Sequence, residues 1–214
     1  QTVNSQSWQE LVFTVVSDTT TPNAEFIISV ISTDPSQGHI QVDSFVVNKA
    51  TISATSIFDI QYTADVSGNS PKDGELVTVT GNVTAKLTKG YFLQDADTAW
   101  SGIYVYDSNN APAVGDNITI SGSVKEYYTL TEITSVSSYT KNSSGNTGYT
   151  PIKISTIAAN SEMYEGVLIQ VKYATCTDAD VTNNFGMFSL DDGSGVAKVD
   201  NDMYSYTPVQ NGVY

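Results

Sequence analysis

The stretch ELVTVTGNVTA, residues 75–85, is the clearest structural signal in this chain. Apolar and polar side chains alternate along it with a period of two residues, which is the pattern of a β-strand that buries one face. Gly81 falls near the middle, where a strand can bend or carry a bulge. The stretch therefore predicts a long, bent strand in an all-β protein.

Four more candidate strands follow this one. They are expected at residues 91–94, 102–106, 117–124 and about 132–139. Five short strands, the first of them bent by a glycine, are the arrangement of an oligonucleotide/oligosaccharide-binding (OB) barrel. We therefore expect an OB-like five-stranded barrel, with its lead-in, over residues 51–140.

The same pattern starts again after a polar linker expected at residues 141–150 (KNSSGNTGYT). Residues 165–177 (EGVLIQVKYATCT) resemble residues 74–85, and the later runs GMFSLD and GVAKVD resemble GYFLQD and GIYVYD. Two strands of the first copy have no counterpart in the second. We therefore expect tandem OB-like barrels, of which the second, over residues 151–214, is incomplete and leaves an open edge beside residues 165–177 or 195–200.

Residues 1–50 form an N-terminal segment with candidate strands at residues 9–17, 25–32 and 39–47. The first two are apolar on both faces, as expected for a strand inserted between two sheet edges. The side chains expected to fill a neighbouring subunit are Leu11, Phe13, Val15, Phe26, Ile28 and Val30. The sequence thus predicts strand donation between copies of this chain, which extends head to tail into a filament because it does not close on itself.

The charge balance excludes most nucleic-acid binders. The formal net charge is −14, and all nine basic residues are Lys. Arg is the side chain best suited to phosphate and guanine, and an acidic surface repels a polyanion. Among ligands, a neutral glycan suits this surface better than DNA.

Catalytic machinery is not recognisable in the sequence, and we expect no enzyme. His39 is the only His, which excludes a His-based dyad with a metal site or a multi-His zinc centre. Cys176 is the only Cys and lies in an apolar run, which favours a buried core residue over a reactive thiol.

Several features are typical of an extracellular or cell-surface protein. The chain begins at Gln1 without an initiator Met, as after signal cleavage, and no stretch is long and apolar enough to span a membrane. Candidate glycosylation sequons begin at Asn82, Asn117 and Asn142. We expect a secreted protein.

The framework phrases SIFDIQYTA, GELVTVTGNVTA, GYFLQD, WSGIYVY, VGDNITISGSVKEYYTLTEI and YEGVLIQVKYATCT carry a family resemblance. Residues 57–202 resemble the tandem OB-fold region of secreted bacterial proteins, as found beside extracellular endonuclease/exonuclease/phosphatase-type nucleases. The resemblance implies the fold and a non-catalytic accessory role, because the chemistry of such proteins sits in a separate domain.

Aromatic side chains gather on the expected first barrel. In an OB fold, the second and third strands carry a stacking platform for bases or sugars. The candidate ligand-binding residues are Tyr91, Trp100, Tyr104 and Tyr106, with Lys86 and Lys89 near the rim. Cross-strand aromatic pairs that only stabilise the sheet are the alternative interpretation.

Paired carboxylates offer one candidate cation site. Asp178, Asp180 and Asn183 come nearest to a calcium loop, although the Gly and the terminal Glu of an EF-hand are missing. Solvated turns are the alternative, in which case the protein needs no cofactor.

Two functions remain open at this point. The first is a non-catalytic structural protein that assembles with copies of itself by strand complementation. The second is an accessory module of a secreted enzyme that binds oligosaccharide or single-stranded nucleic acid on the aromatic face.

Overall fold

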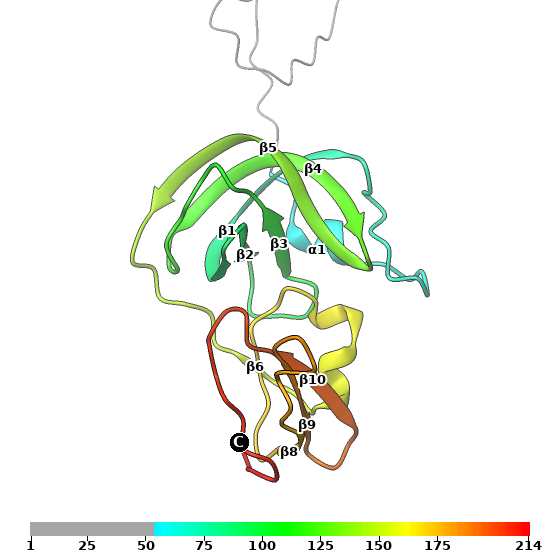
Figure 1. Ribbon diagram of the computed structural model, residues 1–214. Helices are drawn as coiled ribbons and strands as arrows, with labels where there is room; N and C mark the ends of the chain where they lie inside the picture. The colour runs from blue at the N-terminus through cyan, green and yellow to red at the C-terminus, as the bar shows by residue number, and fades with distance from the viewer. Residues whose placement is uncertain (1–53) are drawn as a thin grey trace, which may run out of the picture. The chain divides into compact units, whose positions relative to one another are not determined.

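The computed structural model describes residues 54–214, which belong to one compact unit, Thr51–Tyr214 (Figure 1). The candidate strands at residues 9–17, 25–32 and 39–47 lie outside the described residues. So do the six expected strand-donor side chains, from Leu11 to Val30.

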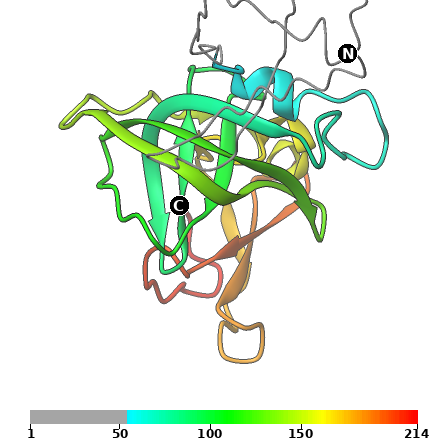
Figure 2. The same cartoon turned by 90° about the horizontal axis from the view of Figure 1, so that it is seen from above.

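Five strands close into a barrel in the order β1-β2-β3-β5-β4 (Figures 1 and 2). They are β1 (Leu76–Leu87), β2 (Gly90–Gln94), β3 (Gly102–Tyr106), β4 (Asn117–Tyr127) and β5 (Leu130–Ser143). Only the β3–β5 pair is parallel, and the other barrel pairs are antiparallel. The predicted all-β fold with an OB-like five-stranded barrel is confirmed.

The bend predicted at Gly81 is built into β1. The first part of β1 pairs with β4 and the last part with β2, and the register with β2 shifts between Val83 and Ala85. A Cβ at Gly81 would lie 2.7 Å from the backbone oxygen of Gln94. Because only glycine allows this approach, β1 can turn from one side of the barrel to the other.

Strand alternation fills the barrel interior. Along β1 every second residue from Val77 to Val83 is buried, and the same alternation continues around the barrel. The core comprises Ile57, Ile60, Val77, Val79, Val83, Tyr91, Leu93, Ile103, Val105, Ile118, Ile120, Val124 and Ile133. Burial of this apolar surface is the main favourable contribution to stability.

A short helix, α1 (Ile57–Gln61), packs on this core and was not predicted, because five residues are too few to show helical periodicity. The Ser56 side chain caps it by accepting the backbone N–H of Asp59 at 3.1 Å. The backbone N–H of Ile57 donates to the Asp95 carboxylate at 2.8 Å.

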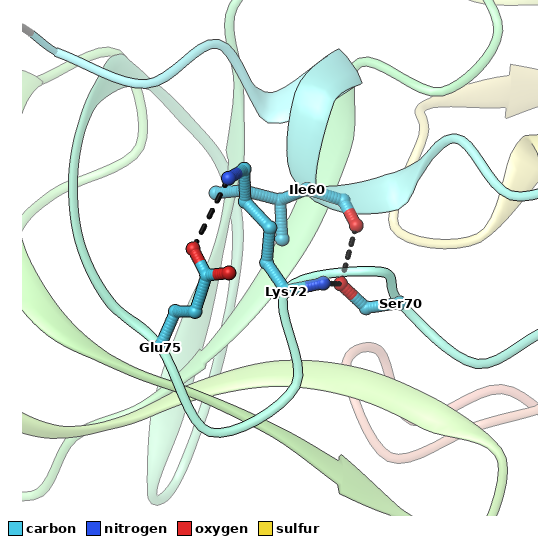
Figure 3. Close-up of polar contacts among 4 residues, drawn as sticks. All are labelled: Ile60, Ser70, Lys72 and Glu75. Atoms are coloured by element: carbon cyan, nitrogen blue, oxygen red, sulfur yellow. Dashed lines mark hydrogen bonds and ion pairs between the residues drawn. The ribbon is translucent and has the colours of Figure 1, made fainter.

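The segment between α1 and β1 is held back onto the helix (Figure 3). The Ser70 hydroxyl donates to the carbonyl of Ile60 and accepts the backbone N–H of Lys72 at 3.0 Å. The Lys72 ammonium pairs with Glu75 at 3.1 Å.

The C-terminal part forms two small sheets and two 3₁₀ turns instead of a second closed barrel within the described residues. Its elements are β6 (Ile152–Lys153), η1 (Ile157–Asn160), η2 (Glu162–Tyr164), β7 (Ile169–Gln170), β8 (Thr175–Asp178), β9 (Met187–Asp191) and β10 (Val196–Asp200). β6 pairs with β7, and β10-β9-β8 form a three-stranded antiparallel sheet (Figure 1). The continuous strand expected at residues 165–177 is interrupted, since Tyr173 adopts a φ of 60°.

The C-terminal part is bonded directly to the barrel. The backbone N–H of Trp100 donates to the carbonyl of Met163 at 2.8 Å, and that of Leu168 donates to the Gln94 side chain at 3.0 Å. β5 also runs to Ser143, into the segment expected to be a linker. Among the described residues, no helix is long and apolar enough to cross a membrane.

Candidate functional site

One face of β2 and β3 turns aromatic side chains away from the core. Phe92 lies opposite Tyr104 in the strand register, and their ring centroids are 5.1 Å apart. Tyr106, two residues further along β3, shares that face and is 45% exposed. The neighbours of opposite phase, Tyr91 and Val105, point into the core instead.

These rings line a hollow of about 480 Å³, here called the aromatic groove. The β1–β2 turn and the β4–β5 turn supply its ends, and Asp202 of the C-terminal part reaches its edge. Its lining residues are Leu87, Thr88, Lys89, Phe92, Tyr104, Tyr106, Tyr127, Leu130, Glu132 and Asp202. The volume lies in the range of small-molecule sites, and the position is the one at which OB folds bind ligands.

Glu132 is the buried charge in the groove. Its side chain lies opposite Tyr104 in the β3–β5 register, and the residue is only 5% exposed. Its carboxylate makes no hydrogen bond or ion pair with any residue of 54–214. Burial raises the pKa of this carboxyl group, and the positive charge of Lys125 partly opposes the shift.

An ammonium group already rests on one ring of the groove. The Lys125 Nζ lies 5.5 Å from the centre of the Tyr127 ring, which is within the range of a cation–π contact. Lys125 is also the cross-strand neighbour of Glu132. The rim of the groove is thus chemically suited to positive charge.

The predicted ligand-binding residues separate into two groups. Tyr104, Tyr106 and Lys89 line the groove, as expected for a platform on strands 2 and 3. The exposed Lys86 lies on β1 outside the groove lining.

Tyr91 and Trp100 lie elsewhere. Tyr91 is 1% exposed in the core, where its hydroxyl donates to Asp107 at 3.1 Å and where burial raises its pKa. The Trp100 ring makes an edge contact with Tyr62, with 5.5 Å between centroids. Neither side chain faces the groove.

Seven of the ten lining residues were not among the predicted ligand-binding residues, and Phe92, Tyr127 and Glu132 are the aromatic or buried charged ones among them. Phe92 could have been found, because the alternation that pairs Tyr104 with Tyr106 also selects Phe92 over Tyr91. The sequence does not place Tyr127 and Glu132 in the groove, because their position there depends on how β4 and β5 pair with the rest of the barrel.

The expected calcium residues form a self-contained turn. The Asp180 carboxylate accepts the backbone N–H and the side-chain amide of Asn183, at 3.1 and 2.6 Å. The Asp178 carboxylate accepts from the backbone N–H of Asp180 and the side chain of Asn184, at 3.0 and 2.9 Å. Nowhere in residues 54–214 do three or more acidic, His or Cys side chains form a group that could hold a metal ion. The geometry assigns these residues to turn formation.

The second candidate site is the edge of the C-terminal sheet. β10 is an end strand. On the side away from β9, its backbone accepts one hydrogen bond from the described residues, from the side-chain amide of Asn160 to the carbonyl of Val196 at 2.9 Å. The opposite edge, β8, is covered by its own chain. The backbones of Ala174 and Tyr214 exchange hydrogen bonds of 3.0 and 2.9 Å there. Of the two open edges expected from the sequence, only the β10 edge is therefore unpaired in the described unit.

The C-terminal part also buries little of its apolar surface. Its buried apolar side chains are Val167, Ala174, Cys176, Phe188 and Ala197. Many large ones stay exposed, namely Ile157, Tyr173, Phe185, Val196, Met203, Tyr204, Tyr206, Val209, Val213 and Tyr214. The C-terminal part therefore leaves more large apolar side chains exposed than it buries.

Comparisons with known proteins add a similarity among solved structures. No protein-family model matches the chain, and no curated protein matches it. Among solved structures, the chain is similar to one titled "Structure of the hypothetical protein ygiW from E. coli.", with 23% sequence identity and a TM-score of 0.32. The match covers 42% of this chain and 89% of the other.

Proposed function

We propose that this chain is a non-catalytic extracellular protein that assembles with copies of itself, by adding a strand of one subunit to the β10 edge of the next. The observation that carries the proposal is the C-terminal sheet, which combines an unpaired edge with poorly buried apolar side chains. An edge strand presents unpaired N–H and C=O groups, which proteins either blunt or pair. Lys198 and Asp200 are the charged residues on β10 that could blunt it.

The N-terminal segment supplies a suitable strand. Residues 9–17 and 25–32 are expected from the sequence to form strands that are apolar on both faces, and either could cover exposed side chains of a neighbour while its backbone pairs with β10. Main-chain hydrogen bonds would supply affinity, and alternate side chains would set the register. Donation from head to tail leaves a free edge on each new subunit, so growth gives a filament.

The test is the size of the full chain in solution, by light scattering and electron microscopy. We expect large, dilution-resistant species. Val196→Asp on β10 should reduce them, because a charge enters the paired surface. Val66→Asp is the matched control, since Val66 is fully exposed in a turn of the lead-in. A monomeric full chain with intact β-sheet circular dichroism would contradict the proposal, as would equal assembly of both variants.

A second function is favoured by the aromatic groove: an accessory module that binds oligosaccharide. Four aromatic side chains converge on one hollow at the ligand-binding face of an OB barrel. The accessory role is in keeping with the resemblance to secreted tandem OB regions. Buried Glu132 and the net charge of −14 disfavour a nucleic acid.

Titration of the full chain with oligosaccharides, followed by Tyr fluorescence, tests this function. We expect saturable binding that Tyr106→Ala weakens and that Tyr173→Ala leaves unchanged, because Tyr173 is exposed in the C-terminal part and does not line the groove. Binding that both variants weaken equally would place the ligand elsewhere.

A further inference from the structure

We infer that the aromatic groove binds an oligosaccharide carrying a free amino group, with the Glu132 carboxylate as the partner of the ammonium. The inference rests on the second function proposed above and specifies its ligand class. It departs from the polyanions and neutral sugars that an OB platform suggests.

The first argument is the state of Glu132. Only 5% of the residue's surface is exposed, yet its carboxylate has no hydrogen-bonding partner within residues 54–214. It lines the groove, and in residues 54–214 the one fully buried side-chain oxygen without a partner is Glu126 Oε2, so the Glu132 oxygens keep some access to solvent. A largely desolvated carboxylate with no hydrogen-bond donor is stabilised by a ligand ammonium that donates to it.

The second argument is the chemistry of the surrounding surface. Phe92, Tyr106 and Tyr127 line the groove beside the largely buried Tyr104, and aromatic rings attract cations and stack with sugars. The Lys125 ammonium already lies on the Tyr127 ring, and Lys89 lines the groove, so the rings left for a ligand are those of β2 and β3. At the other edge, Asp202 adds a second carboxylate, and Asp200 lies in the adjoining hollow.

The third argument separates an amino sugar from a simple amine. An isolated ammonium needs only Glu132 and one ring, which would leave most of the 480 Å³ groove unused. A pyranose ring with an amino substituent can stack on the rings of β2 and β3 while its ammonium reaches Glu132. The acidic surface as a whole would attract such a ligand from solution.

The test uses the full chain and three probes, measured by calorimetry and Tyr fluorescence. They are a glucosamine tetrasaccharide, its fully N-acetylated counterpart and spermidine. The first has ammonium groups and sugar rings, the second only the rings and the third only the charge. We expect the glucosamine tetrasaccharide to bind at least about tenfold more tightly than either of the others.

Two variants locate the preference. Glu132→Gln keeps the shape and removes the charge, so it should abolish the preference for the amino over the acetylated tetrasaccharide. Asp59→Asn removes one charge from the exposed face of α1 and should keep the preference, which controls for general attraction to an acidic protein. Tyr106→Ala should weaken both tetrasaccharides alike. Thermal unfolding of each variant verifies its fold.

Each other outcome has a definite meaning. Equal binding of the two tetrasaccharides overturns the amino-sugar inference and leaves the oligosaccharide function standing. Absence of binding by all three probes overturns both. A preference that survives Glu132→Gln, or spermidine binding as tight as that of the amino tetrasaccharide, also overturns the inference, because the charge of the protein surface would then suffice.

Discussion

The Glu165 carboxylate accepts a hydrogen bond from the backbone N–H of Thr131, 2.9 Å away, and so joins the C-terminal part to β5. The side-chain amide of Gln61, on α1, approaches the same oxygen at 3.4 Å. Burial raises the pKa of Glu165 to about 7, the bond from Thr131 opposes the shift, and the nearby carboxylates of Glu162 and Glu126 add to it. One buried carboxyl group thus links three elements and titrates near neutrality.

The first prediction concerns the pH dependence of stability. The pKa of Glu165 is about 7 in the folded chain against 4.5 when exposed, so the folded state binds the proton more tightly. The contribution of this group therefore favours folding at low pH and is lost as pH rises from about 4.5 to 7, by on the order of 3 kcal/mol. Glu165→Gln should make the thermal unfolding midpoint depend less on pH between about 4.5 and 7. An identical pH profile for variant and parent would contradict the assignment.

The second prediction separates a core role of Tyr91 from a ligand role. Tyr91→Phe removes one hydrogen bond to Asp107, which retains bonds from Asn109 and Asn110, so it should cost about 1 kcal/mol. Tyr91→Ala leaves a cavity in the barrel and should cost about 3–5 kcal/mol in chemical denaturation. Tyr91→Phe should leave oligosaccharide affinity unchanged, and a loss of affinity with an unchanged free energy of unfolding would show that the residue contacts ligand.

The third prediction tests the junction at which Gly102 meets Gly166. A Cβ at Gly102 would overlap the carbonyl group of Gly166 and lie 2.5 Å from the backbone nitrogen of Val167. Gly102→Ala should therefore destabilise the chain by about 1–3 kcal/mol and increase proteolysis of the C-terminal part. Gly148→Ala is the matched control, because a Cβ there meets open space. Equal stability of the two variants would show that the backbone at this junction can shift to accept a Cβ without loss of free energy of unfolding.

The fourth prediction concerns the thiol of Cys176. The residue is fully buried, and its Sγ lies 3.4 Å from the carbonyl of Asp178. A thiol-specific reagent should react with it only as fast as the C-terminal sheet opens, and promptly in denaturant. Immediate reaction of the native chain would mean that this sheet is open in solution.

Local sequence patterns were sufficient for the strands and most of the core. Alternation from Val77 to Val83 predicted β1 and its buried face, and Gly81 predicted its bend, because both depend on residues adjacent in the chain. Charge and composition also argued against a nucleic-acid ligand from the sequence alone, because neither depends on which residues are in contact. The interrupted strand at Tyr173 shows the limit, as its apolar residues look continuous in sequence while the backbone turns.

The candidate sites depended on pairing between distant segments. Glu132 reaches the aromatic groove because β5 lies parallel to β3 and sets it opposite Tyr104, and Glu165 titrates near neutrality because the chain returns to bury it against Thr131. Neither glutamate could be recognised as buried from its neighbours in the sequence, since a glutamate is usually exposed. The sequence alone determined the five strands of the first barrel, because these follow from side-chain periodicity. The unpartnered charge in the groove and the open β10 edge followed only from strand register and packing, which join residues far apart in the chain.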